Sequence, residues 1–336
     1  MGMTTAVVEE EAIAPHLPII DAHQHFWGSD FAFAKTIGRS LPEDLTAEIM
    51  SSGHRIAATV HADCGWAFRT SGPEELRTVG ETEYVDTVAK AFAANIGYVG
   101  KLGAGIVGRA SLMLGDAVVP VLEAHIAASP TRFRGIRELM GSDPDVYQAF
   151  NIPPGKARDP RFLIGFSRLA RLGLSCDVLC AHPMLTDITE LARAFPETSI
   201  IVNHLASPIG VGRFRDKRAE VFADWRAKIT ELAGCPNVYM KLSGVGAHTM
   251  GFDWIEATTK PDSETVASAI RPYILAAIEA FSPSRCMFAS NFPVDSMSFS
   301  YGVLWNAFKR VTSDYSETDK RALFHDTAER VYRLSL

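Results

Sequence analysis

The chain of 336 residues lacks the features that mark several classes of protein. No run of lysine and arginine forms a polybasic patch, and the formal net charge is −6, so nucleic-acid or anionic-membrane binding is disfavoured. No apolar run reaches the roughly 18 residues of a transmembrane helix. Residues 1–16 lack a basic segment followed by an apolar one, and we expect a flexible lead-in rather than a secretory signal.

Cysteine is scarce as well. There are five cysteines, an odd number in so long a chain. Cys176 lies on one predicted strand and Cys180 directly follows it, too far apart along the extended chain to be bonded. We therefore expect reduced thiols in a cytoplasmic protein.

What the chain does contain is an alternation of short apolar runs with longer segments of helical period. We expect eight strands: Leu17–Asp21, Arg55–His61, Gly103–Val107, Phe133–Arg137, Leu174–Leu179, Ser199–Asn203, Asn237–Leu242 and Arg285–Ala289. Strands that alternate with helices form parallel sheets. Eight such units predict an α/β fold, a single (β/α)₈ TIM barrel over residues 17–336, with an extra C-terminal helix at Glu317–Tyr332.

An open doubly wound sheet is the alternative architecture. That fold usually carries a glycine-rich phosphate loop after its first strand. Here the first strand runs into Asp21-Ala22-His23-Gln24-His25 instead. Two histidines separated by one residue point to the same side of a strand, and neutral imidazole is a common ligand of catalytic metals. The pair therefore favours a site at the mouth of a barrel.

Polar side chains gather at the predicted carboxyl ends of the other strands too, as a barrel requires. These residues are His61, Asp63 and Cys64, then Arg109, Arg137 with Glu138, His182, Asn203 with His204, and the segment 290–295. Each has a simpler structural interpretation. His61 is more simply a hydrogen-bonded structural residue, and Arg137 forms either an ion pair or a contact to a substrate carboxylate. Lys241 alternates with apolar neighbours, and we expect it to point outward into solvent.

Six motifs at these positions resemble the amidohydrolase superfamily, in its amidohydrolase-2 branch of TIM-barrel hydrolases. They are DAHQHF (residues 21–26), FRGIR (133–137), IVNHLASPIG (201–210), VYMKLSG (238–244), FASNFPVD (288–295) and FHDTAERVYRL (324–334). The resemblance covers nearly the whole chain. It implies a small-molecule substrate and a divalent metal, with zinc first, although metal-independent catalysis also occurs in the family. The family includes sugar lactonases, a hydrolase of 2-pyrone-4,6-dicarboxylate and metal-dependent decarboxylases.

By position, the resemblance makes His23, His25 and His182 the expected metal ligands and His204 the residue that polarises substrate or moves protons. Asn291 departs from the family, because it stands where most members have an aspartate that binds metal and activates water. An amide cannot accept a proton at neutral pH. We expect the base to be His204 first and then Asp295, with Glu138 a third candidate. Arg137 and His61 are expected to bind substrate.

The first functional hypothesis is therefore hydrolysis of a small cyclic ester, or a related carbonyl compound, carboxylated or derived from a sugar. The second is metal-dependent, non-oxidative decarboxylation of an aromatic or muconate-type acid, which needs no water-activating base at position 291. The third is a non-catalytic relative that binds a carboxylated ligand. We expect a homo-oligomer with no nucleic-acid or membrane partner.

Overall fold

The computed structural model describes residues 8–93, 100–141, 143, 152 and 155–336. Within them, no helix is both long enough and apolar enough to span a membrane.

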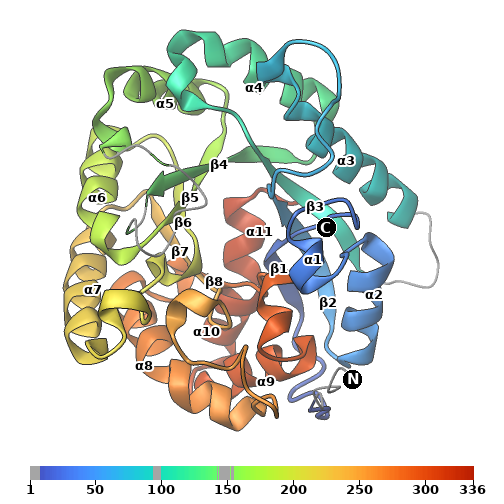
Figure 1. Ribbon diagram of the computed structural model, residues 1–336, viewed down its shortest axis with the longest axis vertical. Coiled ribbons are helices and arrows are strands. Elements are labelled where there is room, and N and C mark those ends of the chain that lie inside the picture. The colour runs from blue at the N-terminus through green and yellow to red at the C-terminus, as the bar shows by residue number, and fades with distance from the viewer. Residues whose placement is uncertain (1–7, 94–99, 142, 144–151, 153–154) are drawn as a thin grey trace.

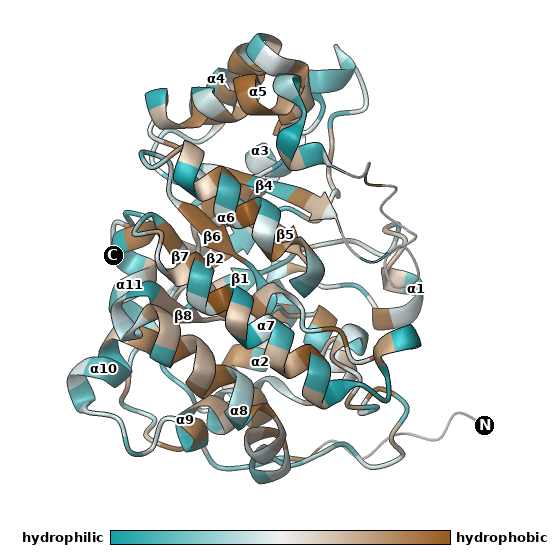
Figure 2. Cartoon of the chain, turned by 90° about the vertical axis from the view of Figure 1, so that its left-hand side faces the viewer, coloured by the Kyte–Doolittle hydropathy of each residue, from teal (hydrophilic) through white to brown (hydrophobic). Residues whose placement is uncertain are grey.

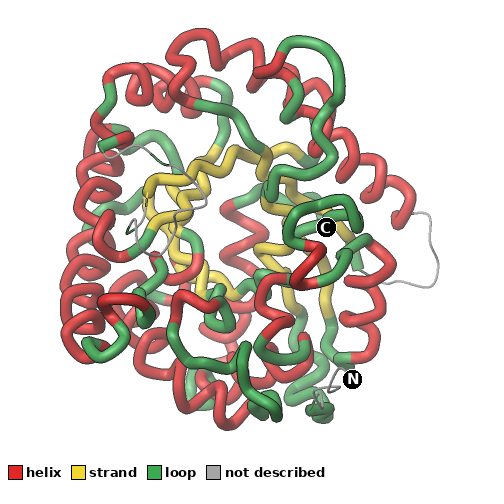
Figure 3. Tube along the Cα trace, in the orientation of Figure 1, coloured by secondary structure: helices red, strands yellow, loops and turns green. Residues whose placement is uncertain are grey.

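Eight parallel strands form one sheet in which each strand pairs with its neighbour in the sequence, from β1 to β8. Their bounds are Ile19–Gln24, Ile56–Ala62, Lys101–Gly108, Phe133–Gly141, Ser175–Cys180, Ile200–Val202, Val238–Leu242 and Cys286–Phe288. Backbone hydrogen bonds just beyond the strands close the sheet: Asn291 N–H donates to His23 O at 2.8 Å, and His25 N–H donates to Phe292 O at 2.9 Å. The strands therefore form a ring, seen nearly end-on in Figure 3, and the predicted TIM barrel is confirmed.

Helices surround this ring (Figure 1). They are α1 Ala34–Ile37, α2 Pro42–Ser51, α3 Val79–Ala93, α4 Val119–Ala128, α5 Pro160–Arg171, α6 Leu185–Ala194, α7 Arg218–Ala233, α8 Ser263–Phe281, α9 Tyr301–Val311, α10 Glu317–Arg321 and α11 Thr327–Val331. A π-helical turn at Ala322–Asp326 joins α10 to α11, so the expected C-terminal helix is present as one bent unit. Ser316 caps it by accepting the N–H of Asp319 at 3.1 Å.

The two larger of three apolar clusters in the described part of the chain form the cores of the barrel. The larger lies between the outer faces of the strands and the helices, and the smaller fills the inside of the ring. In Figure 2 strand β6 is largely brown, because both of its faces are buried, whereas α6 and α7 carry both teal and brown residues. Helix α11 supplies Ala328 and Val331 to the inner core, and Tyr332 directly after the helix joins them, so the C-terminal helical unit closes one end of the barrel. The opposite end remains for the site.

The described part of the expected lead-in contacts the barrel. Residues 8–16 are held against the barrel, because Ile13 N–H donates to Asn306 Oδ1 at 2.8 Å and Glu10 accepts the N–H of Ser263 at 2.7 Å. Lys309 Nζ also donates to the carbonyl oxygens of Ile13 and Ala14. Hydrogen bonds with the start of α8 and with side chains of α9 therefore hold a segment whose own sequence carries no regular pattern.

Candidate active site

The carboxyl ends of the strands enclose a cavity of about 340 Å³. Its lining residues are His25, Trp27, Phe33, Cys64, Arg109, Arg137, Leu139, Leu179, His204, Ser207, Gly244, Ala247, His248, Thr249, Asn291, Val294 and Met297. The wall is mainly apolar, with a few convergent imidazole, guanidinium and amide groups, which is the composition of a small-molecule site. In TIM barrels the active site forms at this end.

His204 reaches the cavity from a strained turn that follows β6. Four consecutive residues, 204–207, have positive φ angles of 55°, 55°, 53° and 39°. Left-handed conformations cost non-glycine residues about 1–3 kcal/mol each, and such strain is concentrated at functional sites. The turn is held by Trp225 Nε1, which donates to Leu205 O at 2.6 Å, and by Ser207 N–H, which donates to His204 O at 2.8 Å. The packing around the barrel thus fixes the direction of the His204 ring.

The imidazole of His204 is oriented by one hydrogen bond. Its Nδ1 lies 2.9 Å from Ser243 Oγ, so Nε2 is the nitrogen left to act on the cavity. Burial, with the nearby charge of Arg137, holds the pKa of His204 well below its ordinary value. The ring is therefore neutral at pH 7, which is the state that accepts a proton.

His23 and His25 lie side by side, as the spacing predicts. Their Nε2 atoms are 3.2 Å apart, and Nδ1 of His25 lies 2.7 Å from Ala62 O. Burial is the main cause that lowers the pKa of His25 to about 3, so this ring is neutral. His25 lines the cavity, and His23 is fully buried beside it with its ring centroid 4.5 Å from that of His204.

Two guanidinium groups are organised around one aspartate. Arg137 Nη1 donates to the backbone oxygen of Asp63 at 2.7 Å, and Arg109 Nε lies 2.9 Å from a carboxylate oxygen of Asp63. Both arginines line the cavity. The two guanidinium groups give this wall of the cavity charged donors that suit an anionic ligand.

Asn291 lines the cavity, whereas Asp295 lies behind it. Asn291 Nδ2 donates to Asp295 Oδ1 at 2.8 Å, and Gly246 N–H donates to Asp295 Oδ2 at 2.9 Å. Burial raises the pKa of Asp295 to about 7, against these two hydrogen bonds. Both carboxylate oxygens of Asp295 therefore accept hydrogen bonds. The side chain of Asp295 does not turn into the cavity, contrary to the expectation, but holds the Asn291 amide in place.

The sequence profile of the amidohydrolase family matches residues 20–334, nearly the whole chain. The chain belongs to this family. It is therefore a hydrolase, as the six motifs predicted.

Two curated relatives show how far this similarity extends. The amidohydrolase is 33% identical to an uncharacterised protein of Sinorhizobium fredii, y4mH, over 95% of this chain and 99% of that protein. It is 29% identical to an L-fucono-1,5-lactonase of Burkholderia ambifaria, over 84% of this chain and 83% of the relative. Both relatives therefore match over most of this chain.

Solved structures of similar proteins share this fold. An amidohydrolase of Burkholderia multivorans, solved with bound HEPES, is 25% identical and superposes with a TM-score of 0.71, over 94% of this chain and 99% of the other. A second crystal form of that protein carries zinc. A putative 2-pyrone-4,6-dicarboxylic acid hydrolase of Pseudomonas putida, at 17% identity and a TM-score of 0.61 over 96% and 99% of the two chains, shares the fold.

Besides His23 and Asp295, three more of the predicted residues lie outside the cavity of this amidohydrolase. Nδ1 of His182 accepts the N–H of Ile209 at 3.3 Å, and its Nε2 lies 4.0 Å from Asp224 on α7. His61 pairs with Glu81 at 3.1 Å in the core, which agrees with the structural interpretation rather than substrate binding. Glu138 accepts the N–H of Leu112 at 2.9 Å and forms an ion pair with Lys156.

The prediction for Lys241 is wrong. Its side chain does not reach solvent but is fully buried inside the barrel, where Nζ lies 2.6 Å from Asp177 Oδ2 and 3.2 Å from His23 Nδ1. A strand of a closed parallel barrel is covered on both faces, by helices outside and by side chains inside. An alternating lysine on such a strand therefore has no solvent to point to and needs a buried partner.

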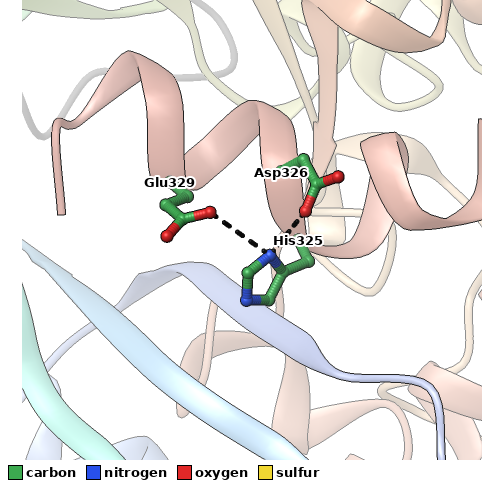
Figure 4. A group of neighbouring side chains, drawn as sticks. All are labelled: His325, Asp326 and Glu329. Atoms are coloured by element: carbon green, nitrogen blue, oxygen red, sulfur yellow. Dashed lines mark hydrogen bonds and ion pairs between the residues drawn. The ribbon is translucent and has the colours of Figure 1, made fainter. Parts of the chain in front are cut away.

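The ligand atoms of His23, His25 and His182 do not all lie within 4.8 Å of one another, so the expected three-histidine metal site is not assembled among the described residues. Among them, one group of three brings its ligand atoms within 4.8 Å of one another: His325, Asp326 and Glu329 (Figure 4). These residues belong to the C-terminal helical unit, where Arg321 Nε lies 3.0 Å from Asp326 Oδ2. The group is accounted for as ion pairs within this helical unit, and none of its members lines the cavity.

Several cavity residues carry no signal of their own in the sequence. Trp27, Val294 and Met297 form apolar wall from loops, where apolar residues are indistinguishable from packing residues. Arg109 follows directly after β3, so its place at a strand end was the available signal. Asp177 carries a different signal, because it is a charged residue within strand β5. Its neighbours Cys176 and Val178 face the outer core.

Proposed function

We propose that the protein hydrolyses a small lactone. The observation that carries this proposal is that His204 and Arg137 line the same cavity. One supplies a neutral imidazole and the other a guanidinium, and ring opening of an ester by water needs both a proton acceptor and a group for the anion. The names of the curated relatives, L-fucono-1,5-lactonase and L-rhamnono-gamma-lactonase, support the same reaction class.

The proposed reaction begins with attack of water on the lactone carbonyl carbon. His204 Nε2 takes a proton from the water as its oxygen forms the new bond. Arg137 holds the developing oxyanion or a carboxylate of the substrate. The ring C–O bond then breaks, and the proton passes from His204 to the leaving alkoxide. One lactone and one water give one hydroxy acid.

Asn291 and the loop behind it complete the site. Because Asp295 fixes the Asn291 amide nitrogen, the Asn291 carbonyl oxygen is the polar atom available to orient substrate or water. No step is assigned to a metal, since the donor set described above does not fit one.

The proposal is tested with a panel of lactones that contains carboxylated lactones, sugar lactones such as L-fucono-1,5-lactone, and uncharged aliphatic lactones. Acid release is followed with a pH indicator, in the presence of a chelator. We expect ring opening of at least one class with turnover well above the spontaneous rate. Folded protein that opens none of them, or that instead releases carbon dioxide from aromatic acids, would overturn the proposal.

A further inference from the structure

A series of buried polar contacts, which we call the contact chain, runs from Asp177 on β5 to the pair His23 and His25. Lys241 Nζ lies 2.6 Å from Asp177 Oδ2 and 3.2 Å from His23 Nδ1, and His23 Nε2 lies 3.2 Å from His25 Nε2. The contact chain ends where His25 Nδ1 lies 2.7 Å from Ala62 O. The order of these contacts determines which atom carries each proton.

The contacts around Asp177, the first part of the contact chain, determine the charge of Lys241. Asp177 accepts hydrogen bonds from Asn203 Nδ2 at 2.9 Å and from Tyr332 OH at 3.0 Å, besides the one from Lys241. Three donors around one carboxyl group suit a carboxylate and leave no acceptor for a proton on it. A buried carboxylate requires a buried cation, so Lys241 is an ammonium group. Its Nζ also lies 5.1 Å from the centre of the Tyr332 ring, a further contact that favours the cation.

The second part fixes the tautomers of the two histidines. An ammonium group has only donors, so His23 Nδ1 must be the acceptor and its proton must lie on Nε2. Ala62 O has only lone pairs, so His25 Nδ1 carries the proton and its Nε2 accepts from His23. Both rings are neutral and both contacts are satisfied. The reverse assignment would place an N–H against the ammonium group and a lone pair against the carbonyl oxygen.

We propose that Lys241 excludes divalent metal ions from the His23–His25 pair by keeping the proton on His23 Nε2. Zinc–nitrogen bonds of about 2.0–2.1 Å in a tetrahedral site place two ligand atoms roughly 3.3 Å apart, so the observed 3.2 Å would suit two ligands. A ligating Nε2 must be unprotonated, which moves the proton to Nδ1, against Lys241. The partner behind the ring, rather than the spacing of the pair, prevents coordination.

The first test is a zinc titration of the full-length protein by calorimetry, with Zn²⁺ itself as the probe. Lys241→Met removes the ammonium group with little change in volume, and Asp177→Asn/Lys241→Met removes both charges. We expect either folded variant to bind zinc on the order of tenfold tighter than the wild type, the lower end of outer-sphere effects on metal affinity. Lys309→Met is the matched control. Lys309 is also buried and lies 2.9 Å from a histidine Nδ1, that of His54, and neither residue lines the cavity.

Zinc affinity that is unchanged in both Lys241 variants, or raised equally in Lys309→Met, would overturn the proposal. A second measurement needs no variant and no substrate. Long-range ¹⁵N–¹H spectra of the wild-type protein distinguish histidine tautomers, and we expect His23 as the Nε2–H form and His25 as the Nδ1–H form. A His23 signal from the Nδ1–H form would contradict the account even if the protein hydrolyses lactones.

Discussion

Gly244 and His204 pack so closely that a β-carbon on Gly244 would lie 2.6 Å from Cβ and 2.9 Å from Nδ1 of His204. Gly244 also has a φ of +66°, which L side chains rarely adopt. Only glycine therefore fits at position 244, between the proposed base His204 and its hydrogen-bonding partner Ser243.

Gly244→Ala is expected to displace the His204 ring and to reduce turnover strongly, because the ring is the group proposed to accept the proton. Gly173→Ala is the matched control: its φ is +65°, and nothing lies within 4 Å of the added carbon. Both variants carry backbone strain of about 1–3 kcal/mol. Activity assays on both variants distinguish the effect of backbone strain from that of the contact with His204. Equal losses of turnover in the two variants would contradict the role assigned to this contact.

Arg137→Met is expected to act on substrates according to their charge. The loss of a hydrogen bond between charged groups costs about 1.5–3 kcal/mol, so KM for a carboxylated lactone should rise roughly 10- to 100-fold. KM for an uncharged lactone of the same ring size should change little. Steady-state kinetics on both lactones checks this.

The control for Arg137→Met is Arg134→Met, on the same strand, since Arg134 does not line the cavity. If Arg137→Met raises KM equally for both lactones, Arg137 does not bind a carboxylate.

Asp295→Asn is expected to remove a pH-dependent loss of stability. Burial raises the pKa of Asp295 from 3.8 to about 7, so the folded protein holds this proton where the unfolded chain has released it. The wild type therefore loses stability as the pH rises from about 4 to about 7 through this group. The amide cannot ionise, and the melting temperature of the variant relative to the wild type should rise between about pH 4 and about pH 7.

Thermal unfolding at several pH values measures this difference. Asp314→Asn, at an exposed site, is the control and should follow the wild type at every pH. A constant difference for Asp295→Asn would show that Asp295 is ionised throughout.

The sequence predicts the barrel well because each strand is a short apolar run between clear turn signals, and all eight strands lie within a few residues of the predicted ones. It does not predict α9, whose tyrosine, tryptophan, phenylalanine and valine residues also suit strands. This helix is stabilised by packing, with most of its side chains buried against the neighbouring elements. Tertiary contacts decide its conformation.

For the site, strand ends indicate position but not direction. His204 and His182 both follow strands, yet the left-handed turn at residues 204–207 directs one ring into the cavity, while His182 faces Ile209 and Asp224. Lys241 shows a second limit of the sequence. The alternation of polar and apolar residues assigns Lys241 to one face of its strand, but only the closed barrel shows that this face is buried. Side-chain direction after a strand depends on contacts that come from distant parts of the chain.

The most direct test of the proposed function is the initial rate of lactone ring opening by His204→Asn compared with the wild type. Asparagine tolerates the left-handed φ of +55° at this position, so the variant should fold with undiminished melting temperature. Loss of a general base predicts a decrease in kcat of about 10²- to 10⁴-fold. A folded His204→Asn variant that opens the lactone at the wild-type rate would contradict the account.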